Sequence, residues 1–418
     1  MIRVARSGGL HLLVLLALEA ACAPPPRAAD DADGGPIMWP WPDAAATDAQ
    51  PASGCHPLFD PQQIYAAHSY PNAVAVADLD GDHHPDLAIT NYMNQTVTLR
   101  FNHGDGTFPS EATHPVGQGP CSLIIDDRDG DGNLDLVVAN LQGDSLSLLF
   151  GTGQGAFAPQ IVYPMGASPA GVRGPSALVT ADFNGDQKSD LAVANEYEWT
   201  ASVLLGSGPS DFVLQGGFAT ARLPVSMVAN DFNGDGKVDL ALANNNQDQV
   251  SVLLGRGDGT FEPQQMYPAG QYSVGIAAGD LNGDGHVDLA VANFYNQNTL
   301  SILLNDGSGT FTTAQTNFPS ANAADAIALA DLDRDGSLDL LVVNALHAGT
   351  LVVLHGNGDG TFTEEGTYAV GDLPVSVMAT DLDGDGWTDA VVANAFSDSV
   401  SVLRNRCAPE PATAAASH

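Results

Sequence analysis

The chain has 418 residues and a formal net charge of −37 at pH 7, because 50 acidic residues stand against only 13 Lys and Arg. So acidic a protein lacks the basic surface that nucleic acids and anionic lipid headgroups require, which argues against both as partners. With 44% hydrophobic residues, the chain can bury a large core.

The first 22 residues have the pattern of a signal peptide. The basic residues Arg3 and Arg6 precede an apolar run over 10–18, and Cys22 follows two small residues. A Cys at this place resembles the lipidated Cys of bacterial lipoprotein signals, so Cys22 is the predicted lipidation site. Plain secretion and a retained anchor are the alternatives. All three predict export, either as a lipoprotein of the outer membrane or cell surface or as a secreted protein.

The segments that flank the predicted folded domain are low in complexity. Residues 23–54 are rich in Ala, Pro and Asp, and residues 408–418 have a similar composition. Such segments cannot bury enough apolar surface to offset the entropy lost on ordering, so we expect a disordered linker and a disordered tail. The folded domain is predicted over 55–407.

A nine-residue loop from Asp231 to Asp239 carries oxygen-bearing side chains at positions 1, 3, 5 and 9. Alternate side chains of a tightly curled loop converge, position 7 adds a backbone carbonyl, and Gly at position 6 supplies a positive φ. These oxygens suit Ca²⁺, while the apolar Leu242 at position 12 distinguishes the loop from an EF-hand. The loop occurs seven times, and the predicted metal ligands at positions 1, 3, 5, 7 and 9 are Asp78, Asp80, Asp82, His84 and Asp86; Asp127, Asp129, Asp131, Asn133 and Asp135; Asp182, Asn184, Asp186, Lys188 and Asp190; Asp231, Asn233, Asp235, Lys237 and Asp239; Asp280, Asn282, Asp284, His286 and Asp288; Asp331, Asp333, Asp335, Ser337 and Asp339; and Asp381, Asp383, Asp385, Trp387 and Asp389.

The first positions of consecutive loops are 49, 55, 49, 49, 51 and 50 residues apart. A period near 50 is typical of propellers and solenoids. Each repeat contains four short β-favouring runs, and continuous apolar runs such as 239–244 suit strands that are packed on both faces. The predicted fold is therefore all-β, a seven-bladed β-propeller with four-stranded antiparallel blades.

The two ends of the predicted domain complement each other. The segment Phe59–Tyr65 matches the fourth-strand segment Phe261–Tyr267, whereas the last repeat stops after its third strand at 400–403. We therefore expect the N-terminal strand to complete the last blade and close the ring. Cys55 and Cys407 fall at the same position of the resulting hairpin, which predicts a disulfide, with two free thiols as the alternative.

The loop Asp-x-[Asp/Asn]-Gly-Asp-Gly-x-x-Asp, followed by Leu-Ala-Val-Ala-Asn and later by Gly-x-Gly-Asp-Gly-Thr-Phe, resembles the FG-GAP/VCBS repeat family. Repeats of this family also form the seven-bladed head of integrin α subunits, where the loop binds Ca²⁺. The resemblance covers about 59–407 and implies five to seven Ca²⁺ sites with a mainly structural role. His83 and Gln187 replace Gly at position 6 of loops one and three, so these two sites are expected to be weak or absent.

Two sets of residues mark the face opposite the loops. An Asn ends the second strand of every repeat, and we interpret these Asn residues as turn-forming rather than ligand-binding. Aromatic residues follow in the turns, where they could form a recognition surface or cover the blade edges; they are Tyr92, Tyr197, Trp199, Phe294, Tyr295 and Phe396.

The sequence contains neither a His-Glu-x-x-His motif nor a nucleophile elbow, so no enzyme activity is expected. The predicted function is a non-enzymatic, extracellular, calcium-binding module for adhesion or protein interaction. A carbohydrate-binding, lectin-like propeller is the alternative, and a polysaccharide-acting enzyme ranks third. The expected partner is an extracellular protein or glycan, and the membrane is reached only through the N-terminal lipid anchor.

Overall fold

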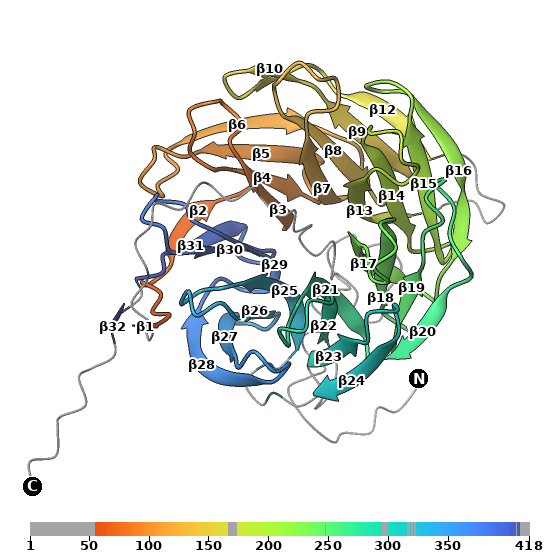
Figure 1. Cartoon of the computed structure of the whole chain (residues 1–418). Helices are drawn as coiled ribbons and strands as arrows, with labels where there is room; N and C mark the ends of the chain where they lie inside the picture. Colours follow the sequence, from red (N-terminus) through yellow and green to blue (C-terminus); the bar gives the residue numbers. More distant parts are fainter. Residues whose placement is uncertain are drawn as a thin grey trace, which may run out of the picture.

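The computed structural model describes residues 55–165, 174–246, 248–294, 300–315, 318, 321, 323–406 and 408–409. These residues form a seven-bladed β-propeller of four-stranded antiparallel sheets, which confirms the predicted fold class (Figure 1). The described residues contain no helix, and hence none that could span a membrane. The predicted signal peptide with Cys22, the linker, Cys407 and the tail beyond 409 lie outside the described residues.

The four strands of each blade are arranged side by side, from the axis of the ring to its rim (Figure 1). The innermost strands are β3 (Pro71–Ala77), β7 (Pro120–Asp126), β13 (Pro175–Ala181), β17 (Pro224–Asn230), β21 (Ser273–Gly279), β25 (Ala324–Ala330) and β29 (Pro374–Thr380). The second strands are β4 (Asp86–Asn91), β8 (Asp135–Asn140), β14 (Asp190–Asn195), β18 (Asp239–Asn244), β22 (Asp288–Asn293), β26 (Asp339–Asn344) and β30 (Asp389–Asn394). The third strands are β5 (Thr96–Phe101), β9 (Ser145–Leu149), β15 (Thr200–Gly206), β19 (Gln249–Leu253), β23 (Leu300–Asn305), β27 (Thr350–Gly356) and β31 (Ser399–Leu403). The outer strands are β6 (Ser110–Pro115), β12 (Ile161–Pro164), β16 (Phe212–Ala219), β20 (Gln265–Pro268), β24 (Phe311–Gln315), β28 (Phe362–Ala369) and β2 (Gln63–Ala66), and a small hairpin of β10 (Gly151–Gly153) and β11 (Ala156–Phe157) extends blade two.

All seven second strands are buried along their whole length. Their apolar residues face both neighbouring blades, so the core is a set of clusters between blades. This burial is the reason for the continuous apolar runs in the sequence. Each second strand begins with the position-9 Asp of its loop and ends with the Asn that recurs in every repeat, so the cation loops lie on one face of the ring and the second-to-third turns on the other.

Each cation loop is tied to the next blade through its second residue. This residue is a buried Leu or Phe in six loops, namely Leu79, Phe183, Phe232, Leu281, Leu332 and Leu382. Its carbonyl oxygen accepts a hydrogen bond from the third-to-fourth hairpin of the following blade, either from an Asn side chain, as in Asn305 Nδ2 to Phe232 O at 2.7 Å, or from a backbone N–H, as in Gly259 to Phe183 at 2.8 Å. In loop two Arg128 takes this place and donates to the carbonyl oxygen of Ser189 in blade three. The loops therefore belong to the contacts that hold neighbouring blades together.

The ring closes as the sequence predicts. Strand β2 pairs with β31 in antiparallel register and forms the outer strand of the blade that also contains β29 and β30. Two further strands, β1 (Cys55–His56) and β32 (Ala408–Pro409), pair with each other, so pairing extends two residues past the predicted boundary at 407. Because Cys407 is outside the described residues, its disulfide with Cys55 stays a prediction.

Candidate metal centres and the opposite face

All seven acidic loops have the same internal hydrogen bonds. The Asp at position 1 accepts the backbone N–H of position 6 at 2.7–3.1 Å. The side chains at positions 3 and 5 each accept the N–H two residues further on. These bonds point one oxygen after another into the loop, as a small hard cation requires.

The Asp at position 9 lies at the base of each loop, where the second strand begins, and is at most 1% exposed in every repeat. One of its oxygens accepts the N–H of position 2, and the other accepts an N–H at the end of the third strand. Asp239, for example, accepts from Phe232 at 2.9 Å and from Gly255 at 2.6 Å. The position-9 carboxylate is therefore a fixed point that joins loop, second strand and third strand.

Burial and mutual repulsion disfavour the charge on these carboxylates. Burial is the largest cause, with neighbouring loop carboxylates adding to it, and together they raise the pKa of Asp86, Asp135, Asp239 and Asp288 to about 6 and that of Asp389 to about 7. The pKa values of Asp190 and Asp339 are raised for the same reason. A bound dication would reverse this effect, because it stabilises the ionised form of every ligand around it.

In four of the seven loops, carboxylate oxygens of the predicted ligands lie close together. In loops one, two, six and seven, three carboxylate oxygens lie within 4.8 Å of one another, as in the group Asp78, Asp80 and Asp86. Loops three, four and five carry Asn in place of Asp at position 3 and keep the same hydrogen bonds. The donor set consists of hard oxygen ligands in loops one to five, so these residues fit Ca²⁺, with carboxylates at positions 1, 5 and 9, a carboxylate or amide at position 3 and the backbone carbonyl of position 7 as its ligands.

Loops one and three keep the common geometry although they lack Gly at position 6. His83 has a φ of 71° and Gln187 a φ of 64°, close to the values of 79–92° at the five Gly residues. Their N–H groups donate to Asp78 and Asp182 as the Gly N–H groups do in the other loops. The missing Gly therefore strains the backbone at these positions without changing the arrangement of the ligands.

Loop six contains a histidine among its carboxylates. His355 is the second-to-last residue of β27, and its Nδ1 lies 3.3 Å from Asp333 Oδ2 and 3.2 Å from Asp339 Oδ1. The corresponding residues of the first five repeats are apolar, namely Phe101, Phe150, Leu205, Leu254 and Leu304. Sequence reasoning missed His355, and the change from an apolar to a basic residue at this repeat position was the available signal.

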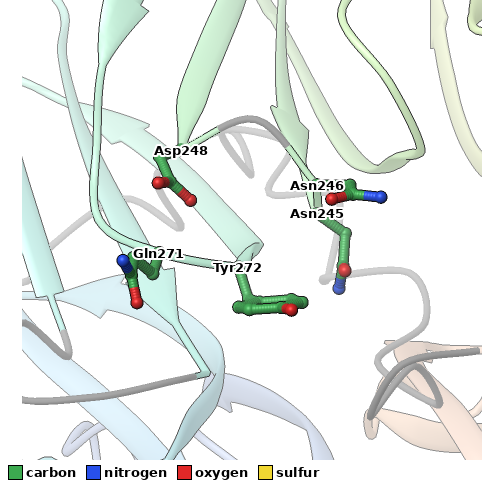
Figure 2. Close-up of a pocket in the computed structure, with 5 residues that line it drawn as sticks. All are labelled: Asn245, Asn246, Asp248, Gln271 and Tyr272. Carbon is green, nitrogen blue, oxygen red and sulfur yellow. The ribbon is translucent and has the colours of Figure 1, made fainter.

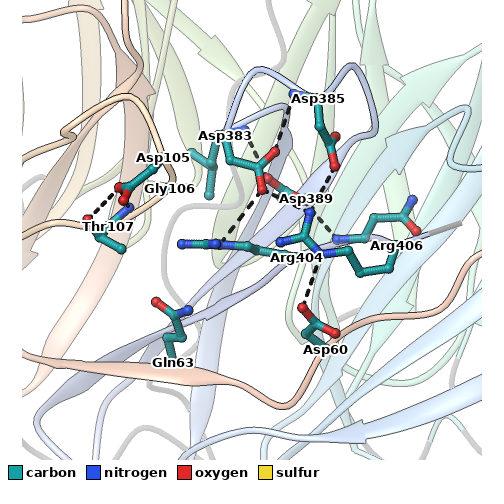
Figure 3. A network of polar contacts seen from close by, with 12 residues as sticks. Asp60, Gln63, Asp105, Gly106, Thr107, Asp383, Asp385, Asp389, Arg404 and Arg406 are labelled. Carbon is teal, nitrogen blue, oxygen red and sulfur yellow. Dashed lines mark hydrogen bonds and ion pairs between the residues drawn. The ribbon is translucent and has the colours of Figure 1, made fainter.

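Loop seven has two arginines on its predicted ligands (Figure 3). Arg406 Nη1 lies 3.0 Å from Asp383 Oδ2 and 2.9 Å from Asp385 Oδ2, while its Nε lies 3.1 Å from Asp60 Oδ2. Arg404, which corresponds to His355, places its Nε 3.9 Å from Asp383 Oδ2. A guanidinium thus contacts the oxygens of positions 3 and 5, which would otherwise be available as ligands of a calcium ion. Sequence reasoning missed both arginines.

Arg334 in loop six replaces the Gly that the other loops have at position 4, and it keeps the positive φ of that position, 60°. Its guanidinium lies 4.4 Å from the centre of the Trp387 ring in loop seven. Arg334 therefore contacts the neighbouring loop.

On the opposite face, the seven Asn residues that end the second strands are buried. Each donates from Nδ2 to a Ser or Thr hydroxyl of the third strand, at 2.8–3.1 Å. This confirms their interpretation as structural residues.

The aromatic residues of the turns divide into two groups. Tyr197, Trp199 and Phe396 are 37–40% exposed, whereas Tyr92 is buried and Phe294 packs against a core cluster between blades. Tyr295 is outside the described residues. Because the exposed aromatics lie on blades three and seven, they do not form one continuous platform.

A polar pocket of about 340 Å³ opens on the same face, between blades four and five (Figure 2). Asn245, Asn246 and Asp248 line it from the turn that follows β18, and Gln271 and Tyr272 line it from the connection that precedes β21. Sequence reasoning did not identify this pocket, because its residues belong to the connections of two neighbouring blades.

Solved structures share the fold at low sequence identity. A structure of BBS1N in complex with ARL6DN, soaked with lead, has 13% identity and a TM-score of 0.59, covering 85% of this chain and 98% of that chain. A virginiamycin B lyase from Staphylococcus aureus, solved with quinupristin, has 13% identity and a TM-score of 0.57, covering 83% and 99%. At this identity the likeness concerns the propeller alone. No curated protein matches the chain.

Family models match most of the ring. The model of the FG-GAP-like repeat matches residues 127–193, 182–242, 231–291, 280–342 and 338–392, and that of the FG-GAP repeat matches 70–107. The matched segments contain the cation loops of all seven blades. The chain belongs to the FG-GAP repeat family.

Proposed function

We propose that this chain is an exported, calcium-stabilised propeller that acts as an adhesion or protein-interaction module without enzyme activity. The observation that carries the proposal is the sevenfold loop: its position-9 carboxylate is buried and its second residue is bonded to the next blade in all seven repeats, and three carboxylate oxygens converge in loops one, two, six and seven. A cation in the loop would relieve the repulsion between carboxylates and would stiffen contacts between blades. Calcium is thus expected to act as scaffold rather than as part of a ligand site.

The expected number of ions follows from the differences among the loops. The Lys side chains of loops three and four, Lys188 and Lys237, are exposed and can move into solvent. In loop two the buried Arg128 side chain lies 3.5 Å from Asp126, which is not a predicted ligand, and donates to Ser189 O. In loop seven, Arg406 already contacts two of the predicted ligands. We therefore expect five or six Ca²⁺ ions per chain, with loops one and three among the occupied sites.

The proposed interaction surface is the face opposite the loops. Large apolar side chains are 37–43% exposed on its turns, namely Met93, Tyr197, Trp199, Leu346 and Phe396. Leu346, Phe396 and Met93 lie on the consecutive blades six, seven and one. Exposed aromatic and Met side chains are the usual anchors of protein interfaces, which supports a protein partner at this part of the rim.

The role of calcium can be tested by thermal unfolding of the whole chain in excess Ca²⁺, in excess Mg²⁺ and in chelator, together with a count of bound calcium. We expect a large loss of stability in chelator, five or six ions in calcium, and weaker protection by Mg²⁺, which demands a stricter octahedral shell. Little difference between calcium and chelator, or fewer than three bound ions, would mean that the acidic loops are only solvated surface.

A further inference from the structure

The polar pocket between blades four and five differs from the same place in the other blades. Asn245 is the residue that directly follows the second strand, and its N–H donates to Leu223 O, as the N–H at this position does in every blade. In blades one, two, six and seven the residue at this position is a buried Tyr92, Leu141, Ala345 or Ala395. Blade five has the partly buried Phe294 here, and only blade three also has a buried polar residue, Glu196, so five of the seven blades close this place with an apolar side chain and blade four does so with an amide.

Asn245 is 2% exposed and lines the pocket. Among the described residues, none donates a hydrogen bond to its buried Oδ1 atom. A buried amide oxygen without a donor is unfavourable unless something else supplies the hydrogen bond. The strand-ending Asn140, Asn195 and Asn244 also have such an oxygen, but Asn245 differs from them because it lines a pocket. In Figure 2 the Asn245 amide and the Tyr272 ring extend toward the same space. The pocket therefore has an acceptor in place for a donor that a ligand could bring.

The walls of the pocket are held by backbone bonds. Tyr272 has a φ of 55°, and its carbonyl oxygen accepts the N–H of Phe294 at 2.9 Å. Asp248 has a φ of 53°, and its carbonyl oxygen accepts the N–H of Ala269 at 2.9 Å. Non-glycine residues adopt this conformation only where the surrounding structure holds them. A site built in this way pays little ordering entropy when a ligand enters.

The lining residues limit the chemistry of the ligand. They provide three amides, one carboxylate and one phenol, and none of the five is basic. Amides both donate and accept, a carboxylate accepts from two neighbouring hydroxyls, and an aromatic ring can cover the C–H face of a sugar. An anion would meet Asp248 in a chain of net charge −37, without a cationic partner in the pocket.

We propose that this pocket binds one uncharged, hydroxyl-rich sugar residue, with Asn245 as the buried hydrogen-bonding group and Tyr272 as the apolar wall. The inference rests on the proposed role of the chain as a binding module and names a ligand class for it. It places the sugar on the face away from the calcium loops, so that the metal supports the site only through the stability of the ring.

Saturation-transfer NMR on the whole chain in saturating Ca²⁺ tests the proposal with a panel of methyl glycosides of neutral hexoses and N-acetylhexosamines. We expect signals from at least one glycoside, and a loss of at least tenfold in affinity for Asn245→Leu and for Tyr272→Ala. Both changes introduce residues that the ring already accommodates at the corresponding places, Leu141 in blade two and Ala323 in blade six. Val213→Ala, which removes an exposed apolar side chain from the outer strand β16 of blade three, away from the pocket, is the matched control and should bind as the unmodified chain does.

Three outcomes would overturn the proposal. The first is no transfer to any glycoside, and the second is binding that survives both pocket variants. The third is transfer to tetramethylammonium instead of the glycosides, which would make Asp248 and Tyr272 part of a cation site. If the chain loses stability in chelator but fails the glycoside test, the calcium-stabilised module stands and only the sugar assignment falls.

Discussion

Replacing Arg404 and Arg406 together by Met should create a calcium site in loop seven. Arg406 holds the carboxylates of positions 3 and 5 at 3.0 and 2.9 Å, and Arg404 lies over Asp383 from the end of the third strand (Figure 3). Met retains most of the length and apolar character of both side chains while it removes the charge. The five predicted ligands of the loop itself stay unchanged.

The expected energies have opposite signs with and without calcium. Removing one partner of a fully buried ion pair costs about 3–5 kcal/mol, whereas an exposed pair contributes about 0–1 kcal/mol. Asp383 is 9% exposed but Arg406 is 37% exposed, so we expect an intermediate loss of about 2 kcal/mol in chelator. In calcium at a hundredfold excess over its dissociation constant, the new site would recover about 2.7 kcal/mol.

The assay is a calcium count per chain together with unfolding in calcium and in chelator. The double variant should bind one ion more than the unmodified chain and should depend more strongly on calcium. Arg256→Met is the matched control, since Arg256 pairs at 2.9 Å with Glu262 of its own hairpin, and it should change neither quantity. A folded double variant with an unchanged count, or an unmodified chain that already binds seven ions, would refute the argument.

Two further predictions concern the loops. In chelator the chain should be more stable at pH 5 than at pH 8, because the folded-state pKa of buried carboxyls such as Asp239 is raised from 3.8 to about 6. Their favourable contribution is complete below the unfolded pKa and is lost as the pH rises through the folded one, so that roughly 1.4 kcal/mol for one carboxyl is lost between pH 5 and pH 8. Saturating Ca²⁺ should flatten or reverse this slope in a series of thermal melts, and equal slopes in both conditions would contradict the placement of calcium in the loops. Gln187→Gly should stabilise the ring by about 0.5–1 kcal/mol, because it relieves a φ of 64°, and Gly236→Ala should destabilise it by a similar amount in the same melts; a Gln187→Gly chain that is less stable would show that the strain is absent.

The fold could be predicted because each repeat contains the same local motifs at the boundaries of its strands. The acidic loop, the buried second strand and the terminal Asn recur at nearly constant spacing, and each has a local physical cause. Even ring closure could be inferred, since the orphan segment that contains β2 matches the fourth-strand segment of blade four and β31 pairs with it. The arrangement of the blades in a closed ring therefore follows from motifs that recur along the sequence.

The properties of individual loops could not be predicted in the same way. Gln187 in loop three suggested a defective loop, yet its N–H donates to Asp182 at 2.7 Å, as a Gly would. His355 and Arg404 lie about twenty residues after their loops in the chain, and only the hairpin between second and third strand brings them onto the carboxylates. A pattern within nine residues predicts the ligands, whereas the occupancy of a site depends on what the third strand places above it.

The position of the two arginines has a consequence for the ring as a whole. Arg406 N–H donates to Leu58 O, and the Asp60 N–H donates to Arg404 O, so the same residues join the N-terminal segment to the last blade. This blade is the place where the ring is closed by hydrogen bonds between the two ends of the chain rather than by a continuous backbone. A guanidinium stays charged at any physiological pH and cannot dissociate from the protein, unlike a calcium ion. Because the Arg406 guanidinium contacts Asp60 of the N-terminal segment as well as Asp383 of loop seven, the closure includes an ion pair whose cation belongs to the chain itself.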